Sequence, residues 1–283
     1  MLVIKTIDNK RVLYEYFQNQ VAPYFFTSSY EEWEKSLDYD IDGQGKKLFR
    51  KLTLIGAYED DALVGFVQYG ESALGFNESG EVSEEISYQI IRNLYYDRNR
   101  SDVGEILLEE SIRDFNPKER IYAFFHYFGM SVYARHGKLF EEYGYIEEML
   151  KHRGFVVEHE NIYYSMYDIA SYHKNGIEIV WSELSTGSTR TAEFRLENEW
   201  VGECEVHFIS NQIAYLRWIY IDEQKQNQRL GSRCIQALLS DIKKEGYVRF
   251  DTDTAIDNVV AQHFYEKNGF EKEGVTRSFY LEM

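Results

Sequence analysis

The chain has 283 residues, 44% of them hydrophobic and 16% aromatic, so it can bury a sizeable core in one large domain or two ordinary ones. Its formal net charge of −17 disfavours nucleic acid and anionic membranes as partners, since like charges repel. Because the chain has no run of about 18 apolar residues and no signal-peptide pattern at its start, we expect a cytoplasmic protein without a transmembrane helix.

The first half of the chain is predicted to open with a strand and a helical stretch over residues 12–37. The alternating segment 62–70 and the apolar segment 87–97 then fit strands. A loop and a helix are expected over residues 98–112, and a strand over residues 121–128. The segment 146–157 fits the end of a helix that runs into a further strand.

The second half is predicted to begin with a strand over residues 177–183 and two antiparallel strands within residues 190–209. Residues 213–222 are apolar nearly throughout, as expected of a strand covered on both faces. From Leu230 the apolar residues recur at helical spacing, and this helix ends in basic residues and Gly246.

A strand over residues 247–254, a short helix over 258–269 and a last strand from Phe270 complete the second half. The order β–β–β–β–α–β–α–β predicts an α/β (α+β) fold in which a mixed, mostly antiparallel, twisted sheet is flanked by helices.

The outline of the first half returns in the second half. Segments 62–70 and 199–208 both place Val-Gly before an alternating strand. The Gly-Phe pairs that begin at Gly154 and Gly269 are each followed, at a similar distance, by two adjacent aromatic residues. The apolar segments 87–97 and 213–222 also correspond, as do the segments 146–157 and 261–272. Four such matches in the same order predict a duplication.

We therefore predict two domains, residues 1–170 and 171–283, without a Pro/Gly/Ser-rich linker between them. The first domain holds 30 acidic and 18 basic residues, a net charge of −12. The second holds 18 acidic and 13 basic residues, a net charge of −5. Since two fused halves can substitute for a homodimer, the protein is expected to be a monomer or a homodimer.

The segment KQNQRLGSRCIQALL, residues 225–239, has the pattern of a phosphate-binding turn that leads into a helix. Free backbone N–H groups and the helix dipole favour an anion at such a helix start. Only Gly231 supplies a glycine, and Arg229 stands where a second glycine would be expected. Four basic residues outnumber two acidic ones around this turn: Arg217, Lys225, Arg229 and Arg233 against Asp222 and Glu223.

These residues resemble the GNAT N-acetyltransferase superfamily, whose signature is Arg/Gln-x-x-Gly-x-Gly/Ala at a helix start. The segment Gln226-Asn227-Gln228-Arg229-Leu230-Gly231 matches at its first and last positions, with arginine in place of the middle glycine. A downstream asparagine, Asn258, and the helix end FYEKNGF, residues 264–270, are also typical of the superfamily.

The resemblance spans roughly residues 199–283, while the first half resembles the superfamily in layout only. The corresponding loop of the first half, residues 99–104, carries Asp102, and Leu150 occupies the place of Tyr265. The first half is therefore interpreted as a degenerate copy.

The resemblance implies acetyl-CoA as cosubstrate. It places the pantetheine arm beside the strand before the turn and the pyrophosphate on the turn itself. It also implies that Tyr265 protonates the leaving thiolate, although a packing role is the alternative. Asn258 is implied as a contact of the cofactor arm, as a helix N-cap, or as both. The expected cofactor-binding residues are Trp218, Ile219, Tyr220, Ile221, Gln226, Asn227, Gln228, Arg229, Leu230, Gly231, Ser232, Asn258 and Tyr265.

Acetyl transfer to an amine also needs a base, because an alkylamine is neutral only about once in 10³ molecules at pH 7. Candidates lie on two predicted strands, and a chain of water molecules is the alternative. The candidates are Glu203, Glu205, His207, Asp251 and Asp253, of which Glu205 and Asp253 are taken with Tyr265 as the catalytic set.

No metal site is expected, because the histidines lack HExxH spacing and Cys204 and Cys234 stand in apolar patterns as core-filling thiols.

The preferred interpretation is an N-acetyltransferase that acts on a small amine acceptor. The acidic first half favours a cationic acceptor, or serves solubility. A non-catalytic acyl-CoA-binding or protein-interaction module is the alternative; a third possibility places acetyl-CoA in the first half, where Asp102 would repel it.

Overall fold

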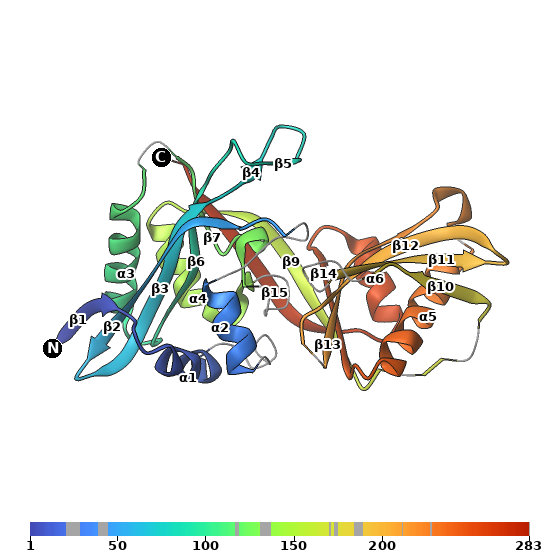
Figure 1. The fold of residues 1–283 in the computed structure, drawn as a ribbon, viewed down its shortest axis with the longest axis horizontal. Helices are drawn as coiled ribbons and strands as arrows, with labels where there is room; N and C mark the ends of the chain where they lie inside the picture. Colours follow the sequence, from blue (N-terminus) through green and yellow to red (C-terminus); the bar gives the residue numbers. More distant parts are fainter. Residues whose placement is uncertain are drawn as a thin grey trace. The chain divides into compact units, whose positions relative to one another are not determined.

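The computed structural model describes residues 1–20, 29–38, 45–116, 119–130, 137–169, 171–172, 175–183, 189–210, 212–226 and 228–282. Two compact units are present. Unit 1 contains residues 1–42, 46–160 and 276–283, and unit 2 contains residues 43–45 and 161–275. Each unit is a mixed α/β structure with a mostly antiparallel sheet and flanking helices, which confirms the predicted fold class (Figure 1).

Unit 1 follows the strand order β1-β2-β3-β6-β7-β15-β9. The strands β6 and β7 pair in parallel, whereas the pairs β1-β2, β2-β3, β3-β6 and β7-β15 are antiparallel. Its helices are α1 (Lys10–Gln20), α2 (Tyr30–Asp38), α3 (Ser101–Arg113) and α4 (Gly144–His152). Its strands are β1 (Leu2–Thr6), β2 (Phe49–Glu59), β3 (Ala62–Ser72), β6 (Gln89–Tyr96), β7 (Ile121–Ala123) and parts of β9 (Val156–Tyr167) and β15 (Glu271–Leu281), with the short strands β4 (Gly75–Phe76), β5 (Val82–Ser83) and β8 (Leu139–Phe140).

Helices cover both faces of the unit 1 sheet, because β3 alternates its side chains between them. Phe66 of β3 packs on Phe17 of α1, with ring centroids 4.8 Å apart. The neighbouring Gly65 faces α3, where a Cβ would lie 2.8 Å from the Val103 side chain. The core of unit 1 is therefore formed in two layers, one on each side of the sheet.

Unit 2 follows the strand order β9-β14-β13-β12-β11-β10, in which only β13 and β14 are parallel. Helices α5 and α6 pack on one face, where Cys204 and Cys234 are buried free thiols of the core, as predicted. No helix of the described residues covers the opposite face. The elements are β10 (Ile177–Trp181), β11 (Thr189–Leu196), β12 (Glu199–Phe208), β13 (Ile213–Ile221), α5 (Leu230–Lys244), β14 (Arg249–Ala255) and α6 (Val259–Lys267).

Three predicted elements differ from the structure. The helical stretch predicted over residues 12–37 includes parts of two separate helices, α1 and α2. The strand predicted over residues 121–128 ends at Ala123, because Phe124 has a φ of 55°, and a 3-10 helix (His126–Phe128) follows. The strand β13 is buried only over residues 213–216; beyond them Trp218 and Tyr220 are exposed.

The last strand of the chain is shared between the two units. Residues 271–275 of β15 belong to unit 2, whereas residues 276–281 belong to unit 1. There Phe279 lies opposite Ala123 of β7 and Leu281 opposite Ile121, and Thr276 and Arg277 pair with β8. Strand β9 is divided in the same way, since only residues 161–167 pair with β14. The compact units thus differ from the sequence halves 1–170 and 171–283, and the division into these halves stays a prediction about the repeat.

The repeated layout is visible in the turns that follow α4 and α6. The N–H of Phe155 donates to the carbonyl oxygen of Leu150 at 3.0 Å, and the N–H of Phe270 donates to that of Tyr265 at 3.1 Å. The glycines before the two phenylalanines have φ values of 90° and 89°. Leu150 therefore occupies the position in unit 1 that Tyr265 occupies in unit 2.

Candidate functional site

The parallel strands of unit 2 separate at their carboxyl ends. Pairing between β13 and β14 runs from Ile213 opposite Arg249 to Leu216 opposite Thr252. β13 continues to Ile221 and β14 to Ala255 without further pairing between them. The backbone of residues 217–221 on the β14 side thus has no strand partner among the described residues. In open α/β sheets, ligands bind beyond the carboxyl ends of the strands where neighbouring connections diverge.

A β-bulge marks the point of separation. The register between β12 and β13 shifts after Glu205, which lies opposite Trp218, whereas Val206 lies opposite Leu216. Arg217 is therefore the extra residue, and a bulge increases the local twist of its strand. Unit 1 has its bulge at the matching place, where Arg92 of β6 is the extra residue.

The two bulge arginines have different partners. Arg217 forms an ion pair of 2.8 Å with Glu205 on the helix-free face of unit 2. Arg92 is buried and donates to the backbone carbonyls of Ser36, Leu37 and Phe128 at 2.9–3.2 Å. In unit 1 the hydrogen bonds of Arg92 thus link α2 to the segment after β7.

The turn after β13 is fastened by its own side chains. Asp222 accepts from the N–H of Gln224 at 3.0 Å, and the Gln226 amide donates to the carbonyl of Ile221 at 3.0 Å. Lys225 donates to the carbonyl of Trp200 and pairs with Glu199, both at 3.1 Å. The chain is thereby held in position for the start of α5 at Leu230. Asn227, one of the predicted cofactor-binding residues, lies outside the described residues.

The start of α5 exposes a cation beside free backbone donors. Gln228 and Arg229 are exposed, and no described residue forms an ion pair or hydrogen bond with the Arg229 guanidinium. No described residue accepts from the N–H groups of residues 230–232, which lack partners within the helix. Gly231 packs closely on α6, since a Cβ there would lie 3.2 Å from the Phe264 ring.

Arg229 adopts the conformation that the superfamily glycine would favour. As the N-cap of α5 it has φ 61° and ψ 14°, in the left-handed region. A side chain in this region costs about 1–2 kcal/mol. The turn thus keeps its shape although the glycine is absent.

Replacing Arg229 by glycine is expected to raise the free energy of unfolding by about 0.5–1 kcal/mol, because glycine adopts the left-handed region without steric penalty. Urea unfolding of the unliganded protein measures the change. Arg229→Ala is the control, since alanine keeps the penalty and should give no gain. Equal stability of the two variants would show that the turn stores no strain.

Helix α6 presents the predicted acid and the predicted cofactor contact. The side chain of Asn258 accepts from the N–H of Ala261 at 3.1 Å, so Asn258 is the N-cap of the helix. Tyr265 is 5% exposed, and its ring lies 5.4–5.8 Å from the rings of Tyr164, Phe264 and Phe270. Its position on the helix-covered face is fixed by these aromatic contacts.

Strand β14 carries buried acids on the opposite, helix-free face. Asp253 accepts from the Tyr215 hydroxyl at 2.6 Å. Asp251 accepts from the Tyr163 hydroxyl and pairs with Arg249 at 2.7 Å. Burial raises the pKa of Asp251, while the Arg249 guanidinium opposes that shift. Asp251 is thus held by structural partners.

Of the other predicted bases, His207 is buried on β12, and burial together with the nearby Arg217 lowers its pKa to about 4. A base is most effective when its pKa lies near the working pH, so His207 is poorly suited. Glu205 is ion-paired with Arg217, whereas Glu203 forms no ion pair with the described residues. The structure thus places Glu203, Glu205 and Asp253 together on the helix-free face and Tyr265 on the other.

Residues that sequence analysis did not identify contribute to this arrangement. Tyr163, Tyr215 and Arg249 hold the two acids of β14. The alternating acids of RFDTDT were a signal that one face is polar, but the tyrosines come from other strands. Their partnership depends on strand register, which the sequence pattern does not supply.

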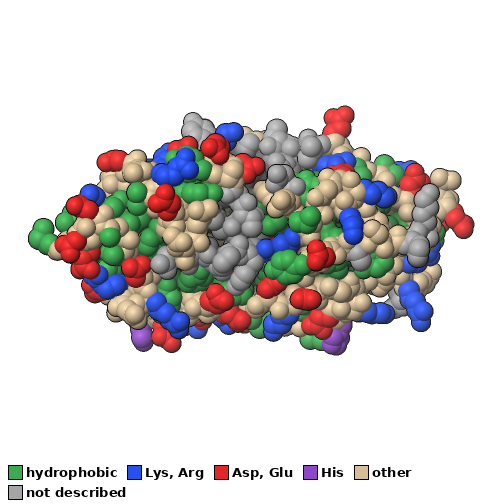
Figure 2. Space-filling model, turned by 90° about the horizontal axis from the view of Figure 1, so that it is seen from below, with side chains coloured by type: hydrophobic (Ala, Val, Ile, Leu, Met, Phe, Trp, Pro, Cys, Tyr) green, Lys and Arg blue, Asp and Glu red, His purple; other side chains and the backbone are tan. Residues whose placement is uncertain are grey.

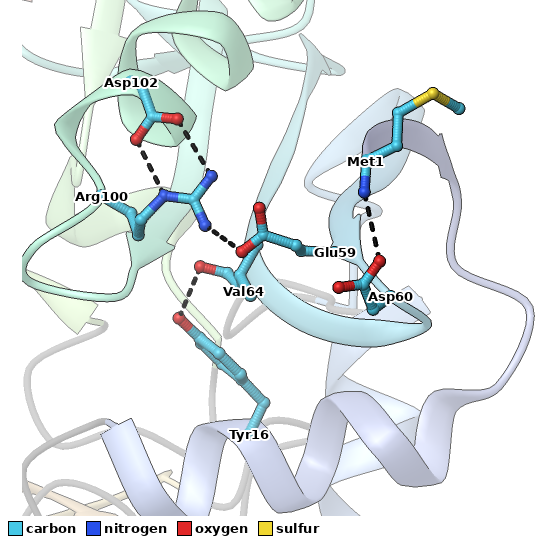
Figure 3. A network of polar contacts seen from close by, with 7 residues as sticks. All are labelled: Met1, Tyr16, Glu59, Asp60, Val64, Arg100 and Asp102. Atoms are coloured by element: carbon cyan, nitrogen blue, oxygen red, sulfur yellow. Dashed lines mark hydrogen bonds and ion pairs between the residues drawn. The ribbon is translucent and has the colours of Figure 1, made fainter.

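The corresponding helix start in unit 1 is neutralised by the protein itself (Figure 3). Arg100, the N-cap of α3, donates to both carboxylate oxygens of Asp102 at 2.9 and 3.0 Å and to Glu59 at 2.6 Å. Asp102 lies in the first helical turn, where an acid offsets the helix dipole. Tyr96 and Tyr145 also donate reciprocally to each other's backbone carbonyls, at 3.2 and 3.0 Å. The Arg100 guanidinium and the Tyr96 carbonyl therefore already have partners within the protein.

Comparison with known proteins places this geometry in a family. Residues 155–270 match the model of the acetyltransferase (GNAT) family. Residues 155–270 are therefore similar to the GNAT family, and the fold of the whole chain is similar to that of tandem GNAT proteins. This family and fold support acyl transfer as the general class of reaction. A sequence search of curated proteins finds no match.

Three solved structures show the similarity of fold. The chain matches a glucosamine N-acetyltransferase region of a fungal multi-domain GH3 β-N-acetylglucosaminidase with a TM-score of 0.66 and 9% identity, over 99% of this chain and 38% of that one. A tandem GNAT protein from the clavulanic acid biosynthesis pathway matches with a TM-score of 0.64 and 10% identity, over 100% of this chain and 98% of that one. A GCN5-related N-acetyltransferase from Sphaerobacter thermophilus matches with a TM-score of 0.57 and 8% identity, over 99% of this chain and 95% of that one.

Two further properties bear on function. Among the described side chains, no group of three or more histidines, cysteines, aspartates or glutamates could hold a metal ion. No helix in the described ranges is long and apolar enough to cross a membrane.

Proposed function

We propose that unit 2 is an N-acetyltransferase that moves an acetyl group from acetyl-CoA to a primary amine of a small, cationic acceptor. The observation that carries the proposal is the separation of β13 from β14 beside a helix start whose arginine has no partner among the described residues. The strand separation leaves backbone groups available to amides, and the helix start leaves N–H groups available to phosphate.

The cofactor-binding residues are proposed on this basis. Residues 228–232 would bind the pyrophosphate, with Arg229 as a charge-assisted donor. The backbone of residues 217–221 would pair with the pantetheine amides, and one of its N–H groups would polarise the thioester carbonyl. Asn258 uses its oxygen for capping, which leaves its amide N–H₂ as a donor for the same ligand.

The proposed reaction forms a C–N bond and breaks the C–S bond of the thioester. The acceptor nitrogen attacks the thioester carbonyl and loses a proton to a base, Glu205 or Asp253, directly or through water. Tyr265 donates a proton to the departing thiolate. The acid and the bases lie on opposite faces of the sheet, so the separated strand ends lie between them.

The alternative is a module that binds acyl-CoA without turnover, which the arginine at the glycine position favours. Release of free thiol from acetyl-CoA, measured across a panel of amines, distinguishes the two. Thiol release that depends on an amine supports the enzyme. Binding of acetyl-CoA without release for every amine would support the module instead.

Ser232→Asp is expected to weaken acetyl-CoA binding by about 10-fold or more, because it places a negative charge in the first turn of α5 near the proposed pyrophosphate position. Ser232→Asn is the matched control of nearly the same size, and it should change affinity far less. Equilibrium binding of acetyl-CoA measures both. Equal affinities of the two variants would place the pyrophosphate elsewhere.

The proposed partners follow from the charge. The net charge of −17 supports a cationic acceptor and argues against nucleic acid and anionic membranes. On the face shown in Figure 2, acidic and basic side chains are interspersed. The fungal relative, described as a glucosamine N-acetyltransferase region, supports a small amine-bearing acceptor. A cytoplasmic location and a monomeric or homodimeric state stay predictions.

A further inference from the structure

Three large aromatic side chains lie exposed on the helix-free face of unit 2. Trp200, Trp218 and Tyr220 are 39%, 39% and 41% exposed. Ile219 and Ile221 pack toward the helices, so Trp218 and Tyr220 point to the opposite face. The rings of Trp200 and Tyr220 are stacked with centroids 6.1 Å apart. We call these three residues the aromatic shelf.

The aromatic shelf borders the proposed acetyl-CoA site. Trp218 follows the bulge residue directly, in the part of β13 that has left β14. Tyr220 lies two residues further along the strand, a distance of about 7 Å. A molecule that reacts near Trp218 can therefore extend over Tyr220 and Trp200.

The shelf adjoins a carboxylate that has no charge partner within the described residues. Glu203 of β12 lies directly between Glu193 of β11 and Tyr220 of β13 in the strand register. Glu193 pairs with Arg195 at 2.7 Å, but none of the described basic side chains pairs with Glu203. Like charges placed directly opposite one another destabilise a sheet. A cation beside Glu203 would remove this repulsion.

Ring faces and a carboxylate together select an ammonium group. The face of tryptophan or tyrosine attracts a cation, and an adjacent carboxylate adds to that attraction. An acidic or purely apolar partner would leave Glu203 uncompensated. Charge complementarity therefore favours a cationic occupant for the aromatic shelf.

We propose that the aromatic shelf and Glu203 bind a second ammonium group of the acceptor, so that the acceptor class is a diamine or polyamine. This inference rests on the proposed acetyl transfer. The amine that attacks the thioester must be neutral, so it cannot supply the positive charge that the shelf recognises. A separate ammonium on the same molecule supplies it, while the neutral amine lies near Trp218 and Glu205.

The kinetic test compares 1,4-diaminobutane with n-butylamine, which has the same carbon chain and one amino group. The wild-type protein is expected to show a lower KM for the diamine. Glu203→Gln and Trp200→Ala should each raise that KM about 2- to 5-fold and leave the KM for n-butylamine within about 2-fold. Glu178→Gln, an exposed acid on β10, is the control and should change neither. Equal KM values for the two amines in the wild-type protein would overturn the inference.

A binding test separates this inference from the proposed function. Tryptophan fluorescence follows 1,4-diaminobutane binding whether or not thiol is released. If no amine supports thiol release, weaker diamine binding to Glu203→Gln than to wild type would still support the shelf. Equal binding by both proteins, or no binding by either, would overturn it. A change in sedimentation mass for Trp200→Ala without a diamine effect would identify the shelf as a contact between copies, and would also overturn it.

Discussion

Replacing Tyr265 by phenylalanine is expected to lower kcat about 100-fold or more while the affinity for acetyl-CoA stays nearly unchanged. The thiolate leaves more readily when a positioned acid protonates it, and phenylalanine cannot donate a proton. The substitution keeps the ring, which is 5% exposed and packed against three aromatic neighbours. Steady-state kinetics and equilibrium binding of acetyl-CoA measure the two quantities.

Tyr164→Phe is the matched control for this prediction. Tyr164 packs on Tyr265 from β9, and its hydroxyl donates to Glu266 at 3.2 Å. Burial and this glutamate raise its pKa to about 12, which makes Tyr164 a poor acid at neutral pH. Loss of the Tyr164 hydroxyl should change kcat by less than about 3-fold. Equal activity of Tyr265→Phe and wild type would leave Tyr265 with a packing role only.

Replacing Phe279 by alanine is expected to destabilise the protein by about 3–5 kcal/mol, with the loss concentrated in unit 1. Phe279 is fully buried and lies opposite Ala123 of β7, although it belongs to the last strand of the chain. The substitution leaves a cavity where β15 completes the sheet of unit 1. Urea unfolding measures the change, and hydrogen exchange locates it in β6 and β7.

Val260→Ala provides the comparison, because Val260 is 82% exposed on α6 of unit 2. A surface substitution of this kind should change the free energy of unfolding by no more than about 0.5 kcal/mol. Faster exchange in β13 and β14 alone, after the Phe279 substitution, would show that β15 stabilises unit 2 rather than unit 1.

The sequence predicted the elements whose pattern is local. The helical spacing from Leu230 onward gave α5, and Asn258 was recognised as a potential N-cap of α6. The duplicated layout was predicted from Val-Gly and Gly-Phe pairs, and the turns at Phe155 and Phe270 have the same hydrogen bonds. Spacing and capping are properties of neighbouring residues, so one sequence suffices to predict them.

Partners between distant strands could not be predicted in this way. Alternation in a strand indicates which residues share a face, but not which strand lies beside it. Nothing in the segment 279–281 indicates that it pairs with β7, and nothing in RFDTDT indicates that Tyr163 and Tyr215 are the partners of its acids. The conformation of Arg229 was also open, because arginine by itself disfavours the left-handed region that the turn imposes.

The shared strand β15 also affects how the protein can fold during translation. Residues 46–160 of unit 1 leave the ribosome long before residues 276–281, which complete the same sheet. At about 5–20 residues per second, the 116 residues from 160 to 276 take roughly 6–23 s to synthesise. Throughout that interval β7 presents an unpaired edge, which is a site for aggregation. The sheet of unit 1 can therefore be completed only after the last strand has been synthesised.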